Sequence, residues 1–336
     1  MIKSVPTNEV PKTLGQIPLA IEAHGLVKVF GDNRAVDGVD LLISTGCIYG
    51  LLGPNGAGKT TIINMLATLL KPDAGTAKIF GHDVKQESHI VRQLISVTGQ
   101  YATVDEKLSA TENLTIFALL LGYNRSEARR KAAELLELFE LTYAANRTLD
   151  KFSGGMRRKL DLATSLLNQS PLIFLDEPTL GLDPRTRIQM WDMIRRLVSH
   201  GCTILLTTQY LDEADQLADR IAVIDHGRVV AEGTPDELKK SVGIAALHLK
   251  LNDAESLDKA MRITQEVLKV KASTSEPTVI TAPMADPEQV TDLLLALREA
   301  GIHLAEVTVQ RPTLDEAFLT LTGDSKQVKK VQPNAQ

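Results

Sequence analysis

Apolar residues fall in short continuous runs along most of the chain, and each run ends at a glycine or a polar turn. The clearest runs are Ile48–Leu52, Pro171–Leu175, Thr203–Thr207 and Ile221–Ile224. Because a strand covered on both faces reads as a continuous apolar run, they predict buried strands. A helix is predicted over Asp183–His200, with Gly201 in the cap position after it. Strands alternating with helices indicate an α/β fold with a largely parallel sheet.

A helical subdomain is predicted between about residues 100 and 165. Ser109 and Glu112 have the spacing of a capping box, which predicts a helix from there through Leu121. A second helix is indicated by apolar residues at helical spacing. These residues are Ala128, Ala132, Leu135, Leu136 and Phe139. The segment therefore inserts helices between two blocks that are rich in strands.

The pattern changes after about residue 242, where short alternating runs predict an α+β segment. The expected strands are 246–251, 278–281 and 307–309, and the expected helices are 254–268 and 287–300. One more short strand before Thr278 would complete a ferredoxin-like β-α-β-β-α-β arrangement. We therefore expect a flexible tail at 1–17, a main domain at 18–241, an accessory domain at 242–323 and a disordered tail at 324–336.

Composition limits the function classes that this chain can belong to. Of its 336 residues 43% are hydrophobic, which is ample for a packed core, and the net charge of −5 argues against a general nucleic-acid binder. Cys47 and Cys202 lack metal-ligand spacing, so we expect two lone thiols in a reducing compartment. No run approaches the roughly 18 apolar residues that span a bilayer. We expect a cytoplasmic protein that serves a membrane only through a partner.

The stretch Gly53–Thr60 reads GPNGAGKT and matches the phosphate-binding loop between a strand and a helix. Its glycines let backbone N–H groups turn toward phosphate without a Cβ in the way. Lys59 is expected to place its charge on the β and γ phosphates, and the Thr60 hydroxyl to ligate Mg²⁺.

A second motif is the apolar strand that ends in Asp176 and Glu177. Two carboxylates at the end of a buried strand are costly unless they meet a cation. We expect Asp176 to hold Mg²⁺ through water, and Glu177 to take the proton of an attacking water. A strand that simply runs into a polar turn is the alternative, and the preceding phosphate loop makes it the weaker one.

Phe152–Met156 reads FSGGM and precedes the acidic strand by about twenty residues. This stretch resembles the signature motif of ABC-type ATPases, usually written LSGGQ. Further positions follow in the order typical of that family. Phe30 matches the aromatic that stacks on adenine, Gln100 the glutamine loop, Asp183 the D-loop and Gln209 the switch histidine.

The resemblance covers roughly residues 20 to 235 and implies the fold of a P-loop ABC ATPase, with a small C-terminal α+β domain beside it. Ser153 and the N–H groups of Gly154 and Gly155, at a helix N-terminus, would form an anion site. In the family this site closes on the γ-phosphate that the opposite subunit binds. Since the chain has one phosphate loop and one signature motif, two copies are implied to enclose two ATP molecules.

The resemblance also implies that Gln100 contacts Mg²⁺ and the attacking water, and that its loop meets a membrane partner. The expected catalytic residues are Lys59, Glu177 and Gln209, and the expected metal ligands are Thr60, Gln100 and Asp176. The expected nucleotide-binding residues are Phe30, Gly53, Pro54, Asn55, Gly56, Ala57, Gly58, Lys59, Thr60, Thr61, Gln100, Ser153, Gly154, Gly155 and Asp183.

Four stretches resemble the ATPases that drive bacterial drug exporters of the daunorubicin-resistance type. They are VTGQY at Val97–Tyr101, FSGGMRR at Phe152–Arg158, TTQY at Thr207–Tyr210 and RPTLDEAF at Arg311–Phe318. The last is expected to be a helix that seats the small domain and aids assembly, with a purely local amphipathic helix as the alternative. The resemblance implies an ATP-hydrolysing subunit on the cytoplasmic face of the membrane, with a second copy and a separate permease as partners and a drug or antibiotic-like molecule as cargo.

Two positions depart from the family pattern, and only one bears on catalysis. Met156 replaces a glutamine after the phosphate-binding glycines, whereas Gln209 replaces the histidine that reaches the terminal phosphate. A regulatory chain without catalysis would need a broken Lys59 or Glu177, and both are intact. We therefore interpret Gln209 as a working variant.

Soluble ABC ATPases that are not coupled to transport remain the alternative function. The DNA-repair and chromosome-structure type needs a long insertion between phosphate loop and signature motif, where this chain has only about ninety residues. The translation type normally holds two cassettes in one chain, and the motifs here make one. Both features favour the transporter subunit, without nucleic acid as a partner.

Overall fold

The computed structural model describes residues 18–98, 104–168, 170–243, 245–284 and 288–323. Contacts between Cα atoms divide the chain into two compact units, Met1–Val229 and Val230–Gln336. The division precedes the boundary expected near residue 242. Its position follows from α8 (Pro235–Val242), which packs against α11 (Leu314–Leu321) within the second unit.

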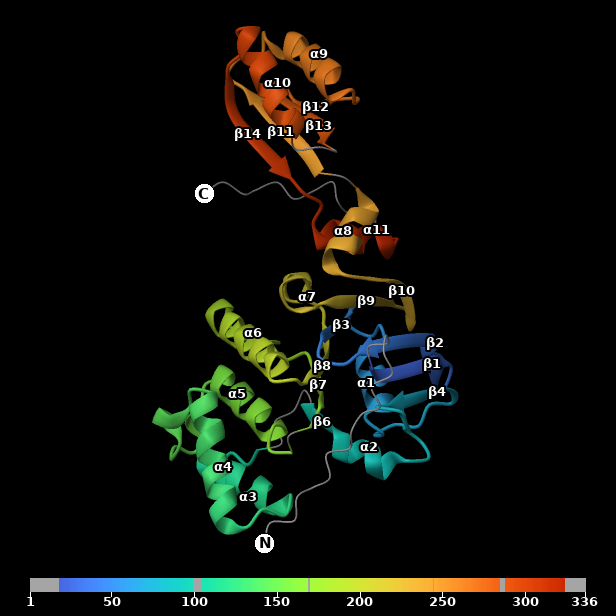
Figure 1. Ribbon diagram of the computed structural model, residues 1–336, viewed down its shortest axis with the longest axis vertical. Coiled ribbons are helices and arrows are strands. Elements are labelled where there is room, and N and C mark those ends of the chain that lie inside the picture. Colours follow the sequence, from blue (N-terminus) through green and yellow to red (C-terminus); the bar gives the residue numbers. More distant parts are fainter. Residues whose placement is uncertain (1–17, 99–103, 169, 244, 285–287, 324–336) are drawn as a thin grey trace. The chain divides into compact units, whose positions relative to one another are not determined.

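The first unit contains two sheets and the helices that cover them (Figure 1). Its strands are β1 (Leu19–Phe30), β2 (Asn33–Ser44), β3 (Ile48–Leu52), β4 (Ala74–Ile79), β5 (His82–Asp83), β6 (Ile95–Thr98), β7 (Leu172–Asp176), β8 (Thr203–Thr208) and β9 (Arg220–Asp225). Its helices are α1 (Lys59–Leu66), α2 (Ser88–Leu94), α3 (Ala110–Leu120), α4 (Arg125–Leu138), α5 (Gly154–Ser165), α6 (Pro184–Ser199) and α7 (Leu211–Leu217).

Five strands of the central sheet lie in the order β9-β3-β8-β7-β6, and every neighbouring pair among them is parallel. The sixth strand of the sheet is β10 (Arg228–Gly233), next to β9, and the boundary between the two units falls within it. The second sheet of this unit is antiparallel, in the order β2-β1-β4-β5. The expected α/β fold with a largely parallel sheet is therefore confirmed.

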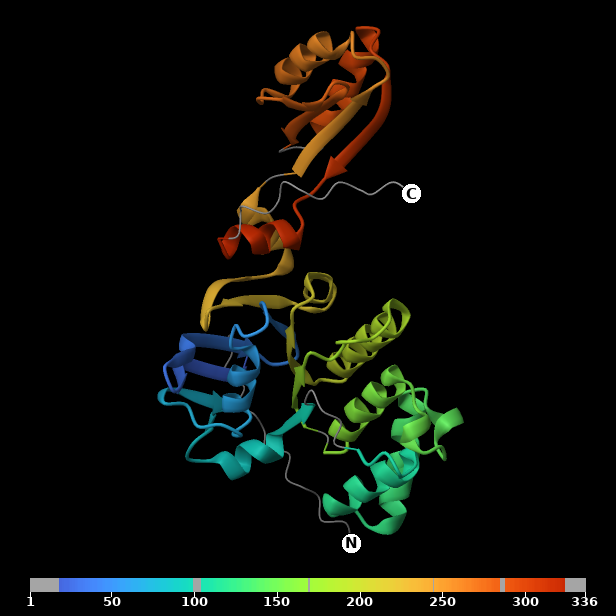
Figure 2. The ribbon, with the colours of Figure 1, turned by 180° about the vertical axis from the view of Figure 1, so that it is seen from behind.

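Alternate side chains of the central strands enter two different cores. Ile173 and Leu175 pack into the core shared with α3, α4, α5 and α6, whereas Leu172 and Phe174 pack into the core shared with α1 and the antiparallel sheet. Figures 1 and 2 show the helices α3 to α6 on one side of the central sheet and β1, β2 and β4 on the other. This double coverage explains why the strands read as continuous apolar runs.

The predicted helix signals have their expected geometry. Ser109 accepts a hydrogen bond from the Glu112 N–H, and the Glu112 side chain accepts from Ser109 in return, which completes the capping box. The helical-spacing residues that predicted α4 are buried on one face, together with Phe139 after its end. Gly201 follows α6 with φ of 93°, which fits the predicted cap.

The second unit contains a β-α-β-β-α-β segment. Its elements are β11 (Ala245–Leu251), α9 (Leu257–Leu268), β12 (Ser273–Glu276), β13 (Val279–Met284), α10 (Glu288–Glu299) and β14 (Leu304–Gln310). The sheet order β12-β13-β11-β14 is antiparallel throughout, and β12 supplies the strand that the ferredoxin-like pattern required before Thr278. No helix in the described parts of the chain is both long and apolar enough to cross a membrane.

Candidate functional site

The strand register brings three sequence motifs to one edge of the central sheet. Leu52 pairs with Thr208 between β3 and β8, and Asp176 pairs with Thr207 between β7 and β8. Because these strands are parallel, the residues after them lie at the same edge. The edge therefore joins the phosphate loop, Glu177 and Gln209.

The phosphate loop keeps its shape because two glycines lie against neighbouring backbone. A Cβ on Gly53 would lie 2.2 Å from the carbonyl oxygen of Ile224, and one on Gly58 would lie 2.3 Å from that of Ala35. Gly58 also has φ of 103°, a left-handed value that disfavours other residues. The loop is thus fixed between other strands before its helix α1 begins.

Lys59 is buried under its own loop, with a side chain only 4% exposed. Its Nζ donates hydrogen bonds to the carbonyl oxygens of Gly53, at 2.6 Å, and Pro54, at 3.0 Å. Burial lowers the pKa of Lys59, and the nearby Glu177 and Asp176 carboxylates oppose that shift. The ammonium is therefore held by loop carbonyls and by two charges at the site.

Asp176 is the centre of a small oxygen cluster. The Thr60 hydroxyl donates to the two carboxylate oxygens of Asp176 at 3.1 and 3.0 Å, and the Thr207 hydroxyl donates to Asp176 Oδ1. Thr207, on β8, was not among the residues predicted from sequence. The pairing joins the phosphate loop to the acidic strand through oxygen atoms alone.

Glu177 begins the turn after β7 with a left-handed φ of 49°. Its N–H donates to the Thr207 hydroxyl at 3.0 Å, and Arg158 donates to the carbonyl oxygens of Asp176 and Glu177 at 3.0 and 2.7 Å. A non-glycine residue in this region needs such support, because the conformation is unfavourable by itself. Arg158 lies in the quoted FSGGMRR stretch, so its position was visible in the sequence but its contact was not.

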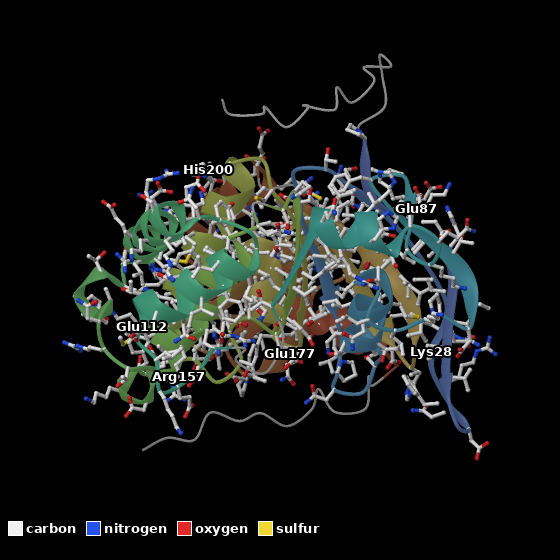
Figure 3. All side chains as sticks on the ribbon, turned by 90° about the horizontal axis from the view of Figure 1, so that it is seen from below. Lys28, Glu87, Glu112, Arg157, Glu177 and His200 are labelled. Atoms are coloured by element: carbon white, nitrogen blue, oxygen red, sulfur yellow. The ribbon has the colours of Figure 1, made fainter. Side chains whose placement is uncertain are left out.

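A cavity of about 440 Å³ lies beside the phosphate loop. It is lined by Phe30, Asn33, Ala35, Asn55, Gly56, Gly58, Lys59, Thr60, Thr61 and Glu177. Figure 3 shows Glu177 between Arg157 on the helical side of the unit and Lys28 on the side of the antiparallel sheet. Seven of the predicted nucleotide-binding residues and the predicted general base therefore share one cavity.

Phe30 forms an exposed wall of this cavity at the end of β1. Its side chain is 48% exposed, and the Lys28 ammonium lies 5.6 Å from the centre of its ring. Lys28 in turn donates to Asp73 Oδ1 at 2.8 Å and to the Lys71 carbonyl oxygen at 3.0 Å. The hydrogen bonds from the Lys28 ammonium and the Val29 N–H lower the pKa of Asp73.

The signature segment occupies the start of α5. Ser153 caps the helix by accepting a hydrogen bond from the Met156 N–H at 3.3 Å, and both Ser153 and Gly154 are exposed. A Cβ on Gly155 would lie 2.4 Å from Thr186 Cγ2, whereas one on Gly154 would meet open space. The described residues that line the cavity do not include Ser153, Gly154 or Gly155.

The remaining predicted residues lie around this edge. Asp183 is exposed and caps α6, accepting from the Thr186 N–H at 3.0 Å, and the hydrogen bonds from Thr186 lower its pKa. Gln209 is half-buried in the segment between β8 and α7. Gln100 lies outside the described residues, so its predicted contacts stay predictions.

A second hollow, of about 350 Å³, lies between β6 and the helices α3 and α5. Val97, Thr98, Phe117, Leu120 and Leu121 line it, and Leu120 is 76% exposed. Thr98 is the last described residue before the segment that contains Gln100. This apolar groove was not predicted, because the apolar face of α3 could equally have been buried in a core.

The chain is similar to known ATP-binding proteins over most of its length. The ABC transporter family model matches residues 36–180. The daunorubicin/doxorubicin resistance ATP-binding protein DrrA of Streptomyces peucetius is 55% identical over 305 residues, which cover 90% of this chain and 92% of that protein. The Nod factor export ATP-binding protein I of Rhizobium sp. (strain N33) is 37% identical over 306 residues, covering 91% of this chain and 97% of that protein.

Solved structures of ATP-binding cassettes share the fold of a large part of this chain. A dimeric ATP-binding cassette in a post-hydrolysis state, bound to ADP and Pi, has 26% sequence identity and a TM-score of 0.59. The match covers 64% of this chain and 98% of the chain in that structure.

Proposed function

Because the chain belongs to the ABC transporter ATP-binding family, we propose that it hydrolyses ATP for a separate export permease and that two copies enclose two MgATP. The observation that carries this proposal is the separation of two half-sites on one chain. Lys59, Thr60 and Glu177 line one cavity, while Ser153 and Gly154 stand exposed at a helix N-terminus outside it. An exposed helix N-terminus attracts an anion. We propose that this anion is the γ-phosphate of the ATP bound to the phosphate loop of a second copy.

Nucleotide binding would exchange protein contacts for phosphate contacts. The Lys59 ammonium now bonds to the carbonyl oxygens of Gly53 and Pro54, and phosphate oxygens would replace these acceptors. Adenine would stack on the exposed Phe30 ring. The other loop residues would offer backbone N–H groups to the phosphates.

The oxygen cluster at Thr60 and Asp176 suits Mg²⁺, which prefers oxygen ligands and retains several waters. These two side chains, with Gln100, would hold the ion, and the ion would neutralise charge on the phosphates. Among the described residues no group of three or more His, Cys, Asp or Glu gathers at one point. This agrees with a metal that is bound by few protein ligands and by substrate oxygens.

Hydrolysis would depend on Glu177 and Gln209. The Glu177 carboxylate lines the cavity and would accept the proton of a water that attacks the γ-phosphate. Gln209 follows β8 at the same sheet edge, and its carboxamide N–H would donate to a γ-phosphate oxygen. Asp183, exposed at the start of α6, would contact the second copy.

The apolar groove beside β6 would receive the permease. Leu120 and Leu121 are exposed there, 76% and 49%, and the segment with Gln100 follows directly after Thr98 on the groove wall. A partner that enters this groove would therefore contact Thr98, which precedes the glutamine-loop segment in the sequence. With such a partner the chain would lie on the cytoplasmic face of the membrane.

The cargo would be a drug or antibiotic-like small molecule. The relative from Streptomyces peucetius is named for daunorubicin and doxorubicin resistance, and the Rhizobium relative for Nod factor export. The higher identity to the first, 55% against 37%, favours a drug-like cargo.

The dimer can be tested with Glu177→Gln. The general base contributes about 10²–10⁴ in rate, so this variant would bind MgATP and keep it. We expect light scattering to show a monomer without nucleotide and a dimer with MgATP, and the unchanged chain to return to monomer as ATP is consumed. A Glu177→Gln chain that binds MgATP and stays monomeric would contradict the proposed arrangement.

A further inference from the structure

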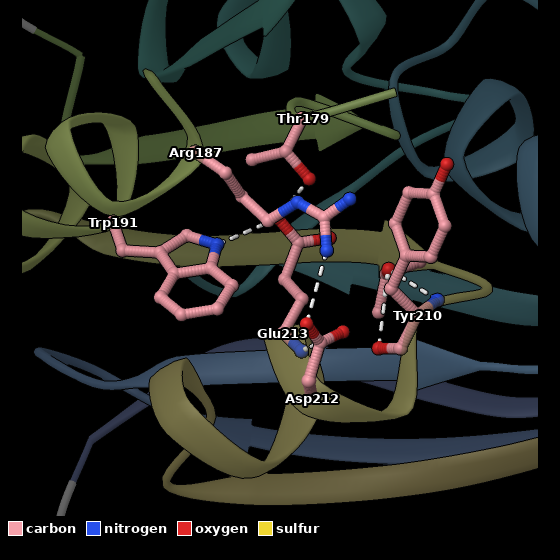
Figure 4. Close-up of polar contacts among 7 residues, drawn as sticks. Thr179, Arg187, Trp191, Tyr210, Asp212 and Glu213 are labelled. Atoms are coloured by element: carbon pink, nitrogen blue, oxygen red, sulfur yellow. Dashed lines mark hydrogen bonds and ion pairs between the residues drawn. The ribbon is translucent and has the colours of Figure 1, made fainter. Parts of the chain in front are cut away.

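A buried polar cluster lies behind the proposed catalytic edge, between the turn after β7 and the helices α6 and α7 (Figure 4). Its centre is Glu213 of α7, whose side chain is completely buried. A buried carboxyl is costly unless other groups compensate for its lost water. None of the roles proposed above uses this residue.

Glu213 joins two other elements through a single oxygen atom. Its Oε1 accepts from the Thr179 hydroxyl at 2.7 Å and from the Trp191 indole N–H at 3.2 Å, while Oε2 is buried without a hydrogen bond. Thr179 lies two residues after Glu177, and Trp191 lies on α6, which begins after Asp183. The Glu213 carboxyl therefore connects the turn that begins at Glu177 to helix α6.

A second set of contacts connects the same helix to the segment that carries Gln209. The Arg187 guanidinium of α6 lies 4.5 Å from the centre of the Tyr210 ring and donates to Asp212 Oδ2 at 3.0 Å. Tyr210 directly follows Gln209, and its N–H donates to the Thr208 hydroxyl at 2.9 Å. Figure 4 shows the Arg187 side chain between Trp191 and Tyr210, with Glu213 and Asp212 beside it.

We infer that Glu213 is a positioning residue that fixes the Gln209 segment relative to Glu177, and this inference rests on the proposed function. Glu213 does not line the nucleotide cavity, so it acts through the groups that it holds. Without its carboxyl, Thr179 and Trp191 would lose their shared acceptor, and α7 could shift against the turn. A misplacement of about 1 Å at a reacting group can cost roughly a hundredfold in rate.

The chemistry of the site also indicates a matched control. Burial raises the pKa of Glu213, and the hydrogen bonds from Thr179 and Trp191 and the charge of Arg187 oppose that shift. A carboxamide retains the Oε1 acceptor and has nearly the same shape, so Glu213→Gln preserves both hydrogen bonds. Glu213→Leu has similar volume and removes the acceptor.

The test compares steady-state ATP hydrolysis by the purified full-length chain and its variants. We expect Glu213→Leu to lower kcat by about 10- to 100-fold while KM and the affinity for a fluorescent ATP analogue change by less than about twofold. Glu213→Gln should stay within roughly threefold of the unchanged kcat, because it keeps the acceptor. A variant that has lost its fold would instead show a lower nucleotide affinity as well as a lower kcat.

Two milder variants keep the test decisive if Glu213→Leu does not fold. Trp191→Phe removes the indole donor, and Thr179→Val removes the hydroxyl with little change of shape. Each should lower kcat by about two- to tenfold with KM unchanged. If folded Glu213→Leu, or both milder variants, turn over ATP at the unchanged rate, the inference is overturned while the proposed function stands. No hydrolysis by the unchanged chain would overturn the proposed function and this inference with it.

Discussion

The phosphate loop and the signature helix are the two proposed anion sites of this chain, and they differ in how complete they are. Lys59 is 4% exposed and already donates hydrogen bonds to two carbonyl oxygens, and the Thr60 hydroxyl donates a hydrogen bond to Asp176. Ser153 and Gly154, by contrast, are exposed at the start of α5. One half-site is assembled by the fold of its own chain, and the other presents its groups outward.

Because of this difference, substitutions in the phosphate loop and in the signature helix should have different effects. A substitution in the phosphate loop should abolish nucleotide binding by a single chain, because the groups that would bind the nucleotide there all belong to that chain. Damage to the signature helix should leave that binding intact and abolish only the step that needs a second copy. Gly154 offers a clean change, since a side chain there would meet open space.

The largest expected effect is the loss of activity in two variants that restore each other. Lys59→Ala should lose nucleotide binding, and Gly154→Asp should bind nucleotide normally but hydrolyse it at least about a hundredfold more slowly, because its carboxylate repels the γ-phosphate. Mixed in equal amounts, the two should recover roughly a quarter of the unchanged activity, since half of the dimers hold one intact composite site. Phosphate release measured across mixing ratios checks this.

Gly154→Ala is the matched control for that experiment, because it adds a side chain without charge and should stay active. An inactive mixture of two folded variants would indicate that each chain builds its whole site alone.

A smaller effect is expected at Gln209, which belongs to neither half-site but lies at the same sheet edge. A hydrogen bond to a charged group is worth about 1.5–3 kcal/mol, so Gln209→Ala should slow hydrolysis about ten- to a hundredfold and leave nucleotide affinity unchanged. Gln209→His should stay active and gain a pH dependence, since imidazole titrates near neutral pH and a carboxamide does not. Hydrolysis by Gln209→Ala at the unmodified rate would remove any phosphate role for this residue.

A still smaller effect is expected at Lys28, which contacts the Phe30 ring on which adenine is proposed to stack. Lys28 lies 5.6 Å from the centre of the Phe30 ring and is held by Asp73. A partly exposed cation–π contact is worth about 0.5–1 kcal/mol, so Lys28→Met should weaken ATP binding by roughly two- to fivefold without changing kcat. Lys28→Arg keeps the charge and should bind normally. Equal affinities in a nucleotide titration of all three chains would show that Lys28 does not support the ring.

The smallest effect on the nucleotide site is expected from removal of the residues after about 242. Every cavity residue lies in the first unit, so nucleotide affinity should change by less than about twofold. The cut removes α11, which packs against α8 in the second unit. We therefore expect weaker assembly or transport, measured by co-purification with the permease and by drug resistance in cells. Full resistance would show the segment to be dispensable.

Sequence reasoning succeeded where a feature depends on residues that are close together in the chain. The capping box at Ser109 and Glu112, the helix from Asp183 and the buried run into Gly53 all have the predicted local geometry. Each is decided within a few residues, by cap hydrogen bonds or by the spacing of apolar side chains. The strands and helices of the second unit also follow local patterns, and β12 is the short strand that was expected before Thr278.

Sequence reasoning was weaker where distant segments meet. The division at Val229 and Val230 reflects packing between α8 and α11, which lie about eighty residues apart. The groove beside β6 was missed because a pattern of apolar residues does not tell which of them stay uncovered. The roles predicted for the nucleotide-contacting residues remain predictions, and Gln100 lies outside the described residues.

The sequence by itself determined the reactive groups of this protein: a glycine loop ahead of Lys59 and Thr60, and two carboxylates at the end of an apolar strand. Only the tertiary structure decided which groups meet, since Thr207, Arg158 and Glu213 reach the general-base turn from strands and helices far along the chain. The physical reason is that residue type sets charge and hydrogen-bonding capacity, whereas distance and burial are set by the strand register and by the packing of helices on the sheet.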